Sequence, residues 1–137
     1  PYTTLFRSSF RCDYGFNIHL HGFALINYNC VFLDTSPIHL GDNVYIAPGV
    51  CLACAGHAIL PQQRSAAIGT SAPITIEDDV WIGANVTVIG GITIGKGSVI
   101  GAGSVVTRNI PSGVIACGNP CRVIREISEK DRINSII

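Results

Sequence analysis

Histidine is the side chain best suited to acid–base chemistry near neutral pH, because its unperturbed pKa lies at about 6.5. Three of the four histidines, His19, His21 and His39, lie among regularly spaced apolar residues, where a solvated or hydrogen-bonded imidazole is the simpler interpretation. His57 differs because it stands at the start of a segment, residues 56–73, that interrupts the spacing. A histidine where a rigid element ends and a loop begins can act as a general base. His57 is therefore the first candidate for catalysis.

The cysteines form two close pairs that could bind a metal or form a redox couple, Cys51 with Cys54 and Cys117 with Cys121. A structural zinc site needs both pairs brought together. The first pair lies within one predicted repeat and the second follows the last repeat, so this is not expected. Cys30 is interpreted as a small buried hydrophobic residue. We predict structural or inert thiols and no metal site, with metal binding and redox chemistry as the less favoured alternatives.

Large apolar residues recur every six positions over most of the chain, with a short slip before residue 40 and a gap over 56–73. A period of six fits neither an α-helix nor a plain alternating strand, but it fits a solenoid whose coil has three flat sides. About four coils are expected, at residues 20–37, 40–57, 76–93 and 94–111. The residues predicted to point into the bore are Leu20, Ile26, Phe32, Leu40, Ile46, Leu52, Ile76, Ile82, Val88, Ile94, Ile100 and Val106.

This pattern predicts an all-β fold with three segments. Residues 1–9 match no repeat, residues 10–111 form the β-helix domain with its loop over 56–73, and residues 112–137 form a C-terminal turn and a short helix packed over the end of the column. The helix is predicted because apolar residues recur at helical spacing among charged residues. These apolar residues are Val123, Ile124, Ile127 and Ile133.

Composition limits the possible partners. The chain has 137 residues and a formal net charge of zero, with 13% charged residues, so no strongly charged surface predicts binding to nucleic acid or to an anionic membrane. Mean hydropathy is +0.41, but no unbroken apolar run is long enough to span a bilayer. We expect the apolar excess in the bore and in an oligomer interface. The opening residues lack the apolar core of a signal peptide, so a cytoplasmic location is expected.

Several motifs taken together are more specific than the repeat. They are CDYGFNIHL (12–20), INYNCVFLD (26–34), IHLGDNVYIAPGV (38–50), PITIEDDVWIGANVTVIGGITIGKGSVIGAGSVVT (73–107) and GNPCRVIREI (118–127). Through them, residues 10–127 resemble the hexapeptide-repeat O-acetyltransferases of the maltose and galactoside acetyltransferase type. The resemblance implies a left-handed parallel β-helix, an exception to the usual crossover hand, assembled as a homotrimer. It also implies active sites between subunits, where acetyl-CoA meets a small hydroxyl acceptor such as a sugar.

The resemblance assigns roles to residues of the acceptor site. His57 corresponds to the family's general base, which would deprotonate the acceptor hydroxyl as it attacks the thioester directly, without a covalent enzyme intermediate. Asn27 and Asp34 correspond to acceptor-binding positions, and an asparagine ladder at a coil corner is the alternative for Asn27. Trp81 is expected to point outward as a wall of the cleft, which is compatible with a trimer contact. The backbone N–H of Ala84 would stabilise the oxyanion.

The resemblance also implies a site for the pantetheine and nucleotide ends of acetyl-CoA. Arginine suits phosphate because of its fork of donors, and a solvated helix face is the alternative for the last two residues of the set. The set is Ala102, Thr107, Arg108, Arg122 and Arg125.

The chain departs from the family at two positions near the predicted base. Thr35 stands where the galactoside branch has a second acidic residue, which makes a galactoside a less suitable acceptor. Ala58 replaces the proline that commonly follows the family's histidine. Two alternatives to sugar acetylation stay open on this scaffold, namely acetylation of an antibiotic and a catalytically silent trimer. A zinc hydro-lyase of the γ-carbonic-anhydrase type needs further histidines downstream, and none follows His57.

Overall fold

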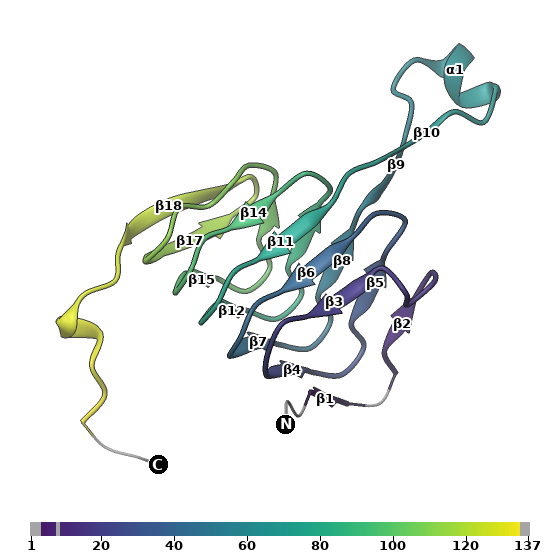
Figure 1. The fold of residues 1–137 in the computed structure, drawn as a ribbon. Coiled ribbons are helices and arrows are strands. Elements are labelled where there is room, and N and C mark those ends of the chain that lie inside the picture. Colours follow the sequence, from purple (N-terminus) through teal and green to yellow (C-terminus); the bar gives the residue numbers. More distant parts are fainter. Residues whose placement is uncertain (1–3, 8, 135–137) are drawn as a thin grey trace.

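The computed structural model describes residues 4–7 and 9–134 as a column of stacked turns with three sides (Figure 1). Equivalent sides of successive turns pair as parallel strands, which confirms the predicted parallel β-helix. Sheet A consists, in spatial order, of β1 (Leu5–Phe6), β4 (Ala24–Ile26), β7 (Val44–Ile46), β12 (Trp81–Ile82), β15 (Val99–Ile100), β17 (Val114–Gly118) and β18 (Cys121–Glu126). Sheet B consists of β2 (Arg11–Cys12), β5 (Val31–Leu33), β8 (Cys51–Ala53), β13 (Thr87–Ile89) and β16 (Val105–Val106). Sheet C consists of β3 (Ile18–Leu20), β6 (Ile38–Leu40), β11 (Ile74–Ile76) and β14 (Thr93–Ile94).

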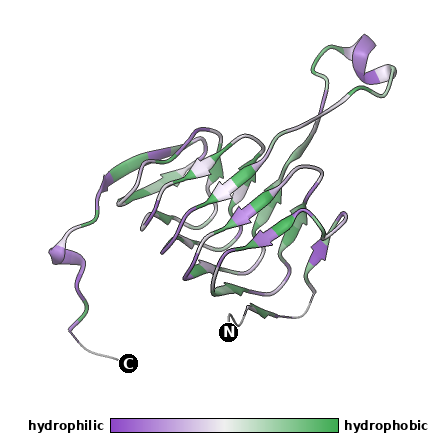
Figure 2. Cartoon of the chain, viewed as in Figure 1, coloured by the Kyte–Doolittle hydropathy of each residue, from purple (hydrophilic) through white to green (hydrophobic). Residues whose placement is uncertain are grey.

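The spacing of six places an apolar residue of each strand inside the column. In sheet A, Ile26, Ile46, Ile82 and Ile100 lie in register on consecutive strands and are at most 1% exposed. Burial of each such side chain stabilises the folded state by about 1.5–3 kcal/mol. Figure 2 shows hydrophobic residues recurring along the strands of the column. The repeated apolar position thus supplies the core of every turn.

Successive turns approach closely enough to require glycine at one corner. A Cβ atom at Gly83 would lie 2.6 Å from the backbone nitrogen of Ala102 on the next turn. The N–H of Gly83 donates to the carbonyl of Ile100 at 2.8 Å, which holds the two turns together at this point. A larger residue at 83 would therefore force neighbouring turns apart.

The column extends beyond the four coils that the spacing predicts. β1 pairs in parallel with β4, and β2 with β5, so another turn precedes residue 20. At this end the ring of Phe10 packs edge to face on the buried ring of Phe32, with centroids 5.1 Å apart. β3 is the outermost strand of sheet C. Leu20, which the spacing places in the bore, therefore remains 37% exposed.

The C-terminal region differs from the predicted helix. β17 pairs with β15 and extends sheet A, and β18 then pairs antiparallel with β17. The only helical element in the described part of this region is a 3₁₀ turn, η1 (Glu129–Asp131). The helix predicted within residues 112–137 is wrong over residues 121–126, which form β18, because the last turn offers unpaired backbone groups and strand pairing satisfies them. Residues 135–137 of this prediction lie outside the described residues. Val123 and Ile124 are 46% and 59% exposed and do not cover the column end.

The interrupting segment projects from the column, as its break in the spacing predicts (Figure 1). It is an antiparallel ribbon of β9 (Ala55–His57) and β10 (Gly69–Ser71), joined through the short helix α1 (Pro61–Ser65). We call residues 55–71 the arm. Its helical tip is hydrophilic (Figure 2). None of the helices in the described residues has the length and apolar character needed to cross a membrane.

Candidate active site

His57 is exposed at the last residue of β9, opposite Gly69 of β10. It lines a groove of about 720 Å³ on the arm. The lining residues all belong to the arm and are mostly apolar: His57, Ala58, Ile59, Leu60, Pro61, Gln63, Ile68 and Thr70. The imidazole is therefore accessible beside a concave surface, on an element that stands clear of the column.

Hydroxyl groups connect the base of the arm to the column. Oγ of Ser71, the last residue of β10, lies 2.7 Å from Oγ1 of Thr35 and 2.6 Å from Oγ of Ser36. The N–H of Cys54 donates to the carbonyl of Leu33 just before the arm begins. Thr35 thus contacts the root of the arm that carries His57.

Asp34 does not lie where it could bind an acceptor. Its side chain is fully buried, and its carboxylate accepts hydrogen bonds from four backbone N–H groups, including those of Tyr14 at 2.9 Å and Gly15 at 2.7 Å. Burial raises the pKa of Asp34, but the N–H donors outweigh it and hold the pKa below its usual range. Because the turn over residues 13–17 occupies both oxygens, Asp34 is a structural anchor and the predicted acceptor contact is corrected.

Trp81 points outward, as predicted, and is 54% exposed. It belongs to a row of apolar side chains on the outer face of sheet A, in register across the strands. Going along the column, the row consists of Leu5, Leu25, Tyr45, Trp81, Val99 and Ile115. Such a continuous apolar row on a sheet surface is typical of an interface or a ligand cleft.

Three of the predicted site residues share one corner of the column. Asn27, Ala84 and Ala102 follow sheet A strands β4, β12 and β15, and so lie where the chain turns from sheet A to sheet B. The carbonyl of Ala84 accepts the N–H of Gly103 at 2.8 Å, while within the described residues its own N–H donates no backbone hydrogen bond. Asn27 is half-buried, and its Oδ1 accepts the N–H of Tyr28.

Three further predicted residues lie at the next corner. The arm with His57 leaves the column after β8, and Thr107 and Arg108 follow β16, so all three residues lie where sheet B meets sheet C. Sheet B separates this corner from the corner that holds Asn27 and Ala84. Within a single chain the predicted catalytic residue and the predicted oxyanion donor are thus on different corners.

The two arginines of β18 differ in their partners. Arg125 donates to both carboxylate oxygens of Asp131, at 2.6 and 2.9 Å, and these hydrogen bonds are the main reason that the pKa of Asp131 falls to about 2. Arg122 makes one backbone contact, from Nη1 to the carbonyl of Cys121 at 2.9 Å. Arg122 retains N–H donors that could bind a phosphate, whereas the guanidinium of Arg125 is already hydrogen-bonded to Asp131. Both lie on a strand, so the helix-face alternative does not apply.

Known proteins share both the sequence repeat and the fold of this chain. Residues 73–108 match the family model described as the hexapeptide repeat of succinyl-transferase. A hexapeptide-repeat-containing acetyltransferase from Vibrio cholerae, solved with acetyl-CoA, is 38% identical, with a TM-score of 0.91 over 93% of this chain and 70% of that chain. The chain belongs to the hexapeptide-repeat acetyltransferases.

Members of this acetyltransferase family with named acceptors are also similar. A maltose O-acetyltransferase from Clostridium difficile is 51% identical, with a TM-score of 0.87 over 89% of this chain and 65% of that chain. The galactoside O-acetyltransferase of Escherichia coli is 48% identical over 120 residues, covering 88% of this chain and 59% of that protein. The chain spans less than two thirds of the length of the first curated relatives it matches.

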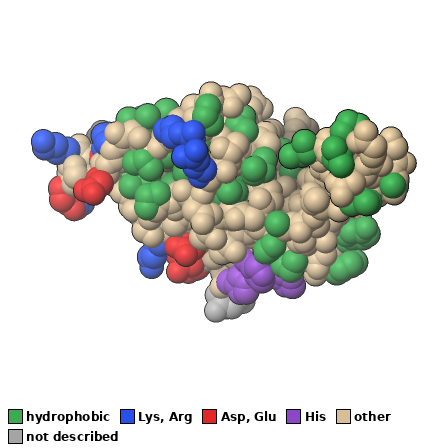
Figure 3. All heavy atoms as spheres, turned by 90° about the horizontal axis from the view of Figure 1, so that it is seen from above, with side chains coloured by type: hydrophobic (Ala, Val, Ile, Leu, Met, Phe, Trp, Pro, Cys, Tyr) green, Lys and Arg blue, Asp and Glu red, His purple; other side chains and the backbone are tan. Residues whose placement is uncertain are grey.

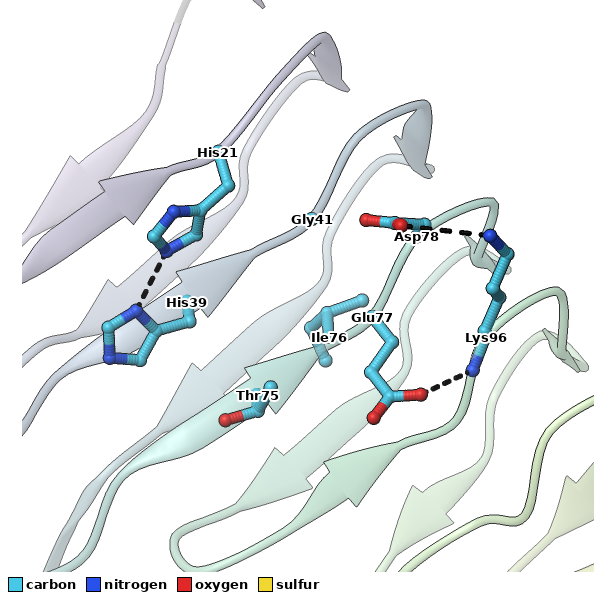
Figure 4. Close-up of a pocket in the computed structure, with 8 residues that line it drawn as sticks. All are labelled: His21, His39, Gly41, Thr75, Ile76, Glu77, Asp78 and Lys96. Atoms are coloured by element: carbon cyan, nitrogen blue, oxygen red, sulfur yellow. Dashed lines mark hydrogen bonds and ion pairs between the residues drawn. The ribbon is translucent and has the colours of Figure 1, made fainter.

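Outside the predicted site, the chain has a second depression, on the outer face of sheet C. It measures about 500 Å³ and lies between His21 and His39 on one side and Glu77 and Lys96 on the other (Figure 4). His39 also stacks on His19, with ring centroids 4.8 Å apart. Figure 3 shows histidine side chains gathered in one surface patch. In the described residues no group of three or more His, Cys, Asp or Glu side chains could hold a metal ion.

Proposed function

We propose that this chain is an acetyl-CoA-dependent O-acetyltransferase that modifies a hydroxyl group of a sugar or a similar small molecule in the cytoplasm. The observation that carries the proposal is the exposed imidazole of His57 beside a groove on the arm. Family membership supports the reaction class, and the relatives named for maltose and galactoside support a sugar acceptor.

In the proposed mechanism His57 accepts the proton of the acceptor hydroxyl while the hydroxyl oxygen attacks the thioester carbonyl of acetyl-CoA. The carbonyl π bond opens to an oxyanion, which the N–H of Ala84 stabilises. The carbonyl then re-forms as the carbon–sulfur bond breaks. The leaving CoA sulfur takes the proton from His57, so the products are the acetyl ester and free CoA thiol, and the base is regenerated.

We also propose that the active site forms between subunits of a homotrimer. His57 and Ala84 lie on different corners of one column, and only arm residues line the groove beside His57. An arm from one subunit laid against sheet A of another would bring His57 to Trp81 and Ala84. The apolar outer row of sheet A suits such a contact. Light scattering tests this arrangement, and a mass near the 14.5 kDa of one chain at micromolar concentration would contradict it.

The activity is tested by thiol release from acetyl-CoA with a panel of sugars and with chloramphenicol. We expect release that depends on a sugar acceptor and that is lost in the His57→Ala variant. Release with chloramphenicol alone would instead favour the antibiotic-modifying alternative. A folded trimer that releases no thiol with any acceptor would support a silent scaffold and overturn the proposal.

A further inference from the structure

We infer that Arg64 is a positioning residue that holds the backbone beside His57 and thereby orients the catalytic imidazole. This inference rests on the proposed role of His57 as the general base.

The contacts of Arg64 converge on the residues that follow His57. Nη1 of Arg64 donates to the carbonyl of Ala58 at 2.9 Å and to the carbonyl of Ile59 at 3.0 Å. Arg64 lies in the last turn of α1, and its guanidinium returns across the tip of the arm to reach these carbonyls. Because the donor is charged, each hydrogen bond is stronger than one between neutral groups. One side chain therefore connects α1 to the segment just after the base.

Both the backbone N–H and the backbone carbonyl of Ala58 form hydrogen bonds within the arm. Its N–H donates to the carbonyl of Ile68 at 3.1 Å, and its carbonyl accepts from Arg64. Ala58 is also 7% exposed, in contrast to its neighbours Ile59 and Leu60, which are 93% and 55% exposed. The hydrogen bond to Ile68 fixes the peptide between His57 and Ala58, and the hydrogen bond from Arg64 fixes the next peptide, between Ala58 and Ile59. Since the rotamers open to a side chain depend on its own backbone angles, restraint of Ala58 on both sides limits the orientation of the neighbouring imidazole.

The arm has few other means of fixing this region. The ribbon has three residue pairs, and His57 lies in the pair farthest from the column. Helix α1 contains no buried residue, so no apolar core holds the tip against the ribbon. Ala58 itself has no ring that would restrict its φ. The hydrogen bonds of Arg64 therefore add to the single ribbon hydrogen bond from Ala58 to Ile68.

Arg64 is not among the residues that line the groove beside His57. Because Arg64 lies outside the groove, its role is to position His57 and not to contact either substrate. Loss of Arg64 should therefore lower kcat and leave the KM for acetyl-CoA nearly unchanged, because displacement of a catalytic group by about 1 Å can reduce the rate by a large factor.

The test compares Arg64→Ala, Arg64→Lys and Gln62→Ala in the full chain. Gln62 lies on the same helix and is outside the groove, which makes it a matched control. We expect kcat to fall about tenfold or more in Arg64→Ala, with KM within about twofold. Arg64→Lys should recover most of this loss, because an ammonium can donate to both carbonyls. Gln62→Ala should match the parent chain.

A measurement independent of turnover separates this inference from the proposed function. Backbone amide ¹⁵N relaxation should show increased fast motion at residues 57–60 in Arg64→Ala, and parent-like order in Arg64→Lys. If the parent chain transfers no acetyl group but this motion still appears, the proposed function fails and the restraint by Arg64 stands. Parent-like order and kcat in Arg64→Ala would overturn the inference, as would a raised KM with unchanged kcat. Global unfolding of that variant, shown by loss of its thermal transition, would also overturn it.

Discussion

Nε2 of His21 lies 3.0 Å from Nδ1 of His39 on the outer face of sheet C (Figure 4). One ring must donate and the other accept, so the contact requires at least one neutral imidazole. Burial lowers the pKa of His39, and the neighbouring His19 and His21 lower it further. Glu77, Asp78 and Lys96 line the same depression. Protonation of His39 thus opposes folding.

This relationship predicts lower stability in acid. Because the pKa of His39 is lower in the folded chain than in the unfolded chain, the unfolded chain binds more protons below about pH 6.5. The contribution of His39 is complete above that pH and is lost as the pH falls through its folded value. Chemical denaturation at a series of pH values should show this loss. His39→Thr, which copies Thr75 at the same position on the next turn, should flatten the profile. An unchanged slope would exclude His39 as the source.

Replacement of Asp34 should destabilise the fold. Asp34→Asn places an amide donor among four backbone N–H groups that need an acceptor, in a side chain with no exposed surface. We expect the free energy of unfolding to fall by about 2–4 kcal/mol, measured by thermal or chemical denaturation. Asp13→Asn is the matched control, because Asp13 is an exposed acidic residue of the same turn. Equal stability of the two variants would contradict the structural role of Asp34.

Removal of the His57 imidazole should abolish most of the acetyl transfer without affecting the fold. His57→Ala is expected to lower turnover by about 10²- to 10⁴-fold, the usual contribution of a positioned base. Thiol release measures the loss, while circular dichroism and light scattering check the fold and the assembly. His39→Thr serves as the control, since His39 lies on sheet C and outside the arm. If the His57→Ala variant acetylated nearly as fast as the parent chain, His57 would not be the general base.

The arginines should differ in their effect on acetyl-CoA binding. Arg122 retains free donors, and Arg108 is exposed two residues after β16. The Arg108→Ala, Arg122→Ala double variant should therefore raise the KM for acetyl-CoA by about ten- to a hundredfold. Because these groups lie away from the reacting carbon in the proposed complex, kcat should stay within a few fold.

Arg125→Ala is the comparison variant for this experiment. Its guanidinium is paired with Asp131, so its loss should change the KM by about twofold or less. A larger KM effect in Arg125→Ala than in the double variant would show that Asp131 releases the arginine to the nucleotide.

The sequence alone determined the column and the place of the arm. Burial at every sixth position is a local property, because each hexapeptide forms one side of a turn and each turn repeats the last. Ile46, Ile82 and Ile100 therefore fall inside the bore whichever turn is considered. The interruption of the six-residue spacing after Gly56 likewise indicated where the chain leaves the column. His57 lies at that point and is exposed.

Only the tertiary structure decided which polar groups meet. Asp34 resembles an acceptor ligand in sequence, but a turn some twenty residues earlier folds over its carboxylate. Apolar residues recur at helical spacing after residue 121, yet the open edge of β17 makes residues 121–126 a strand. Arg64 carries no sequence signal for its contact with Ala58, which depends on the path of the arm. Apolar burial follows a period that can be counted along the chain, whereas a hydrogen bond depends on partners that only the folded backbone brings within reach.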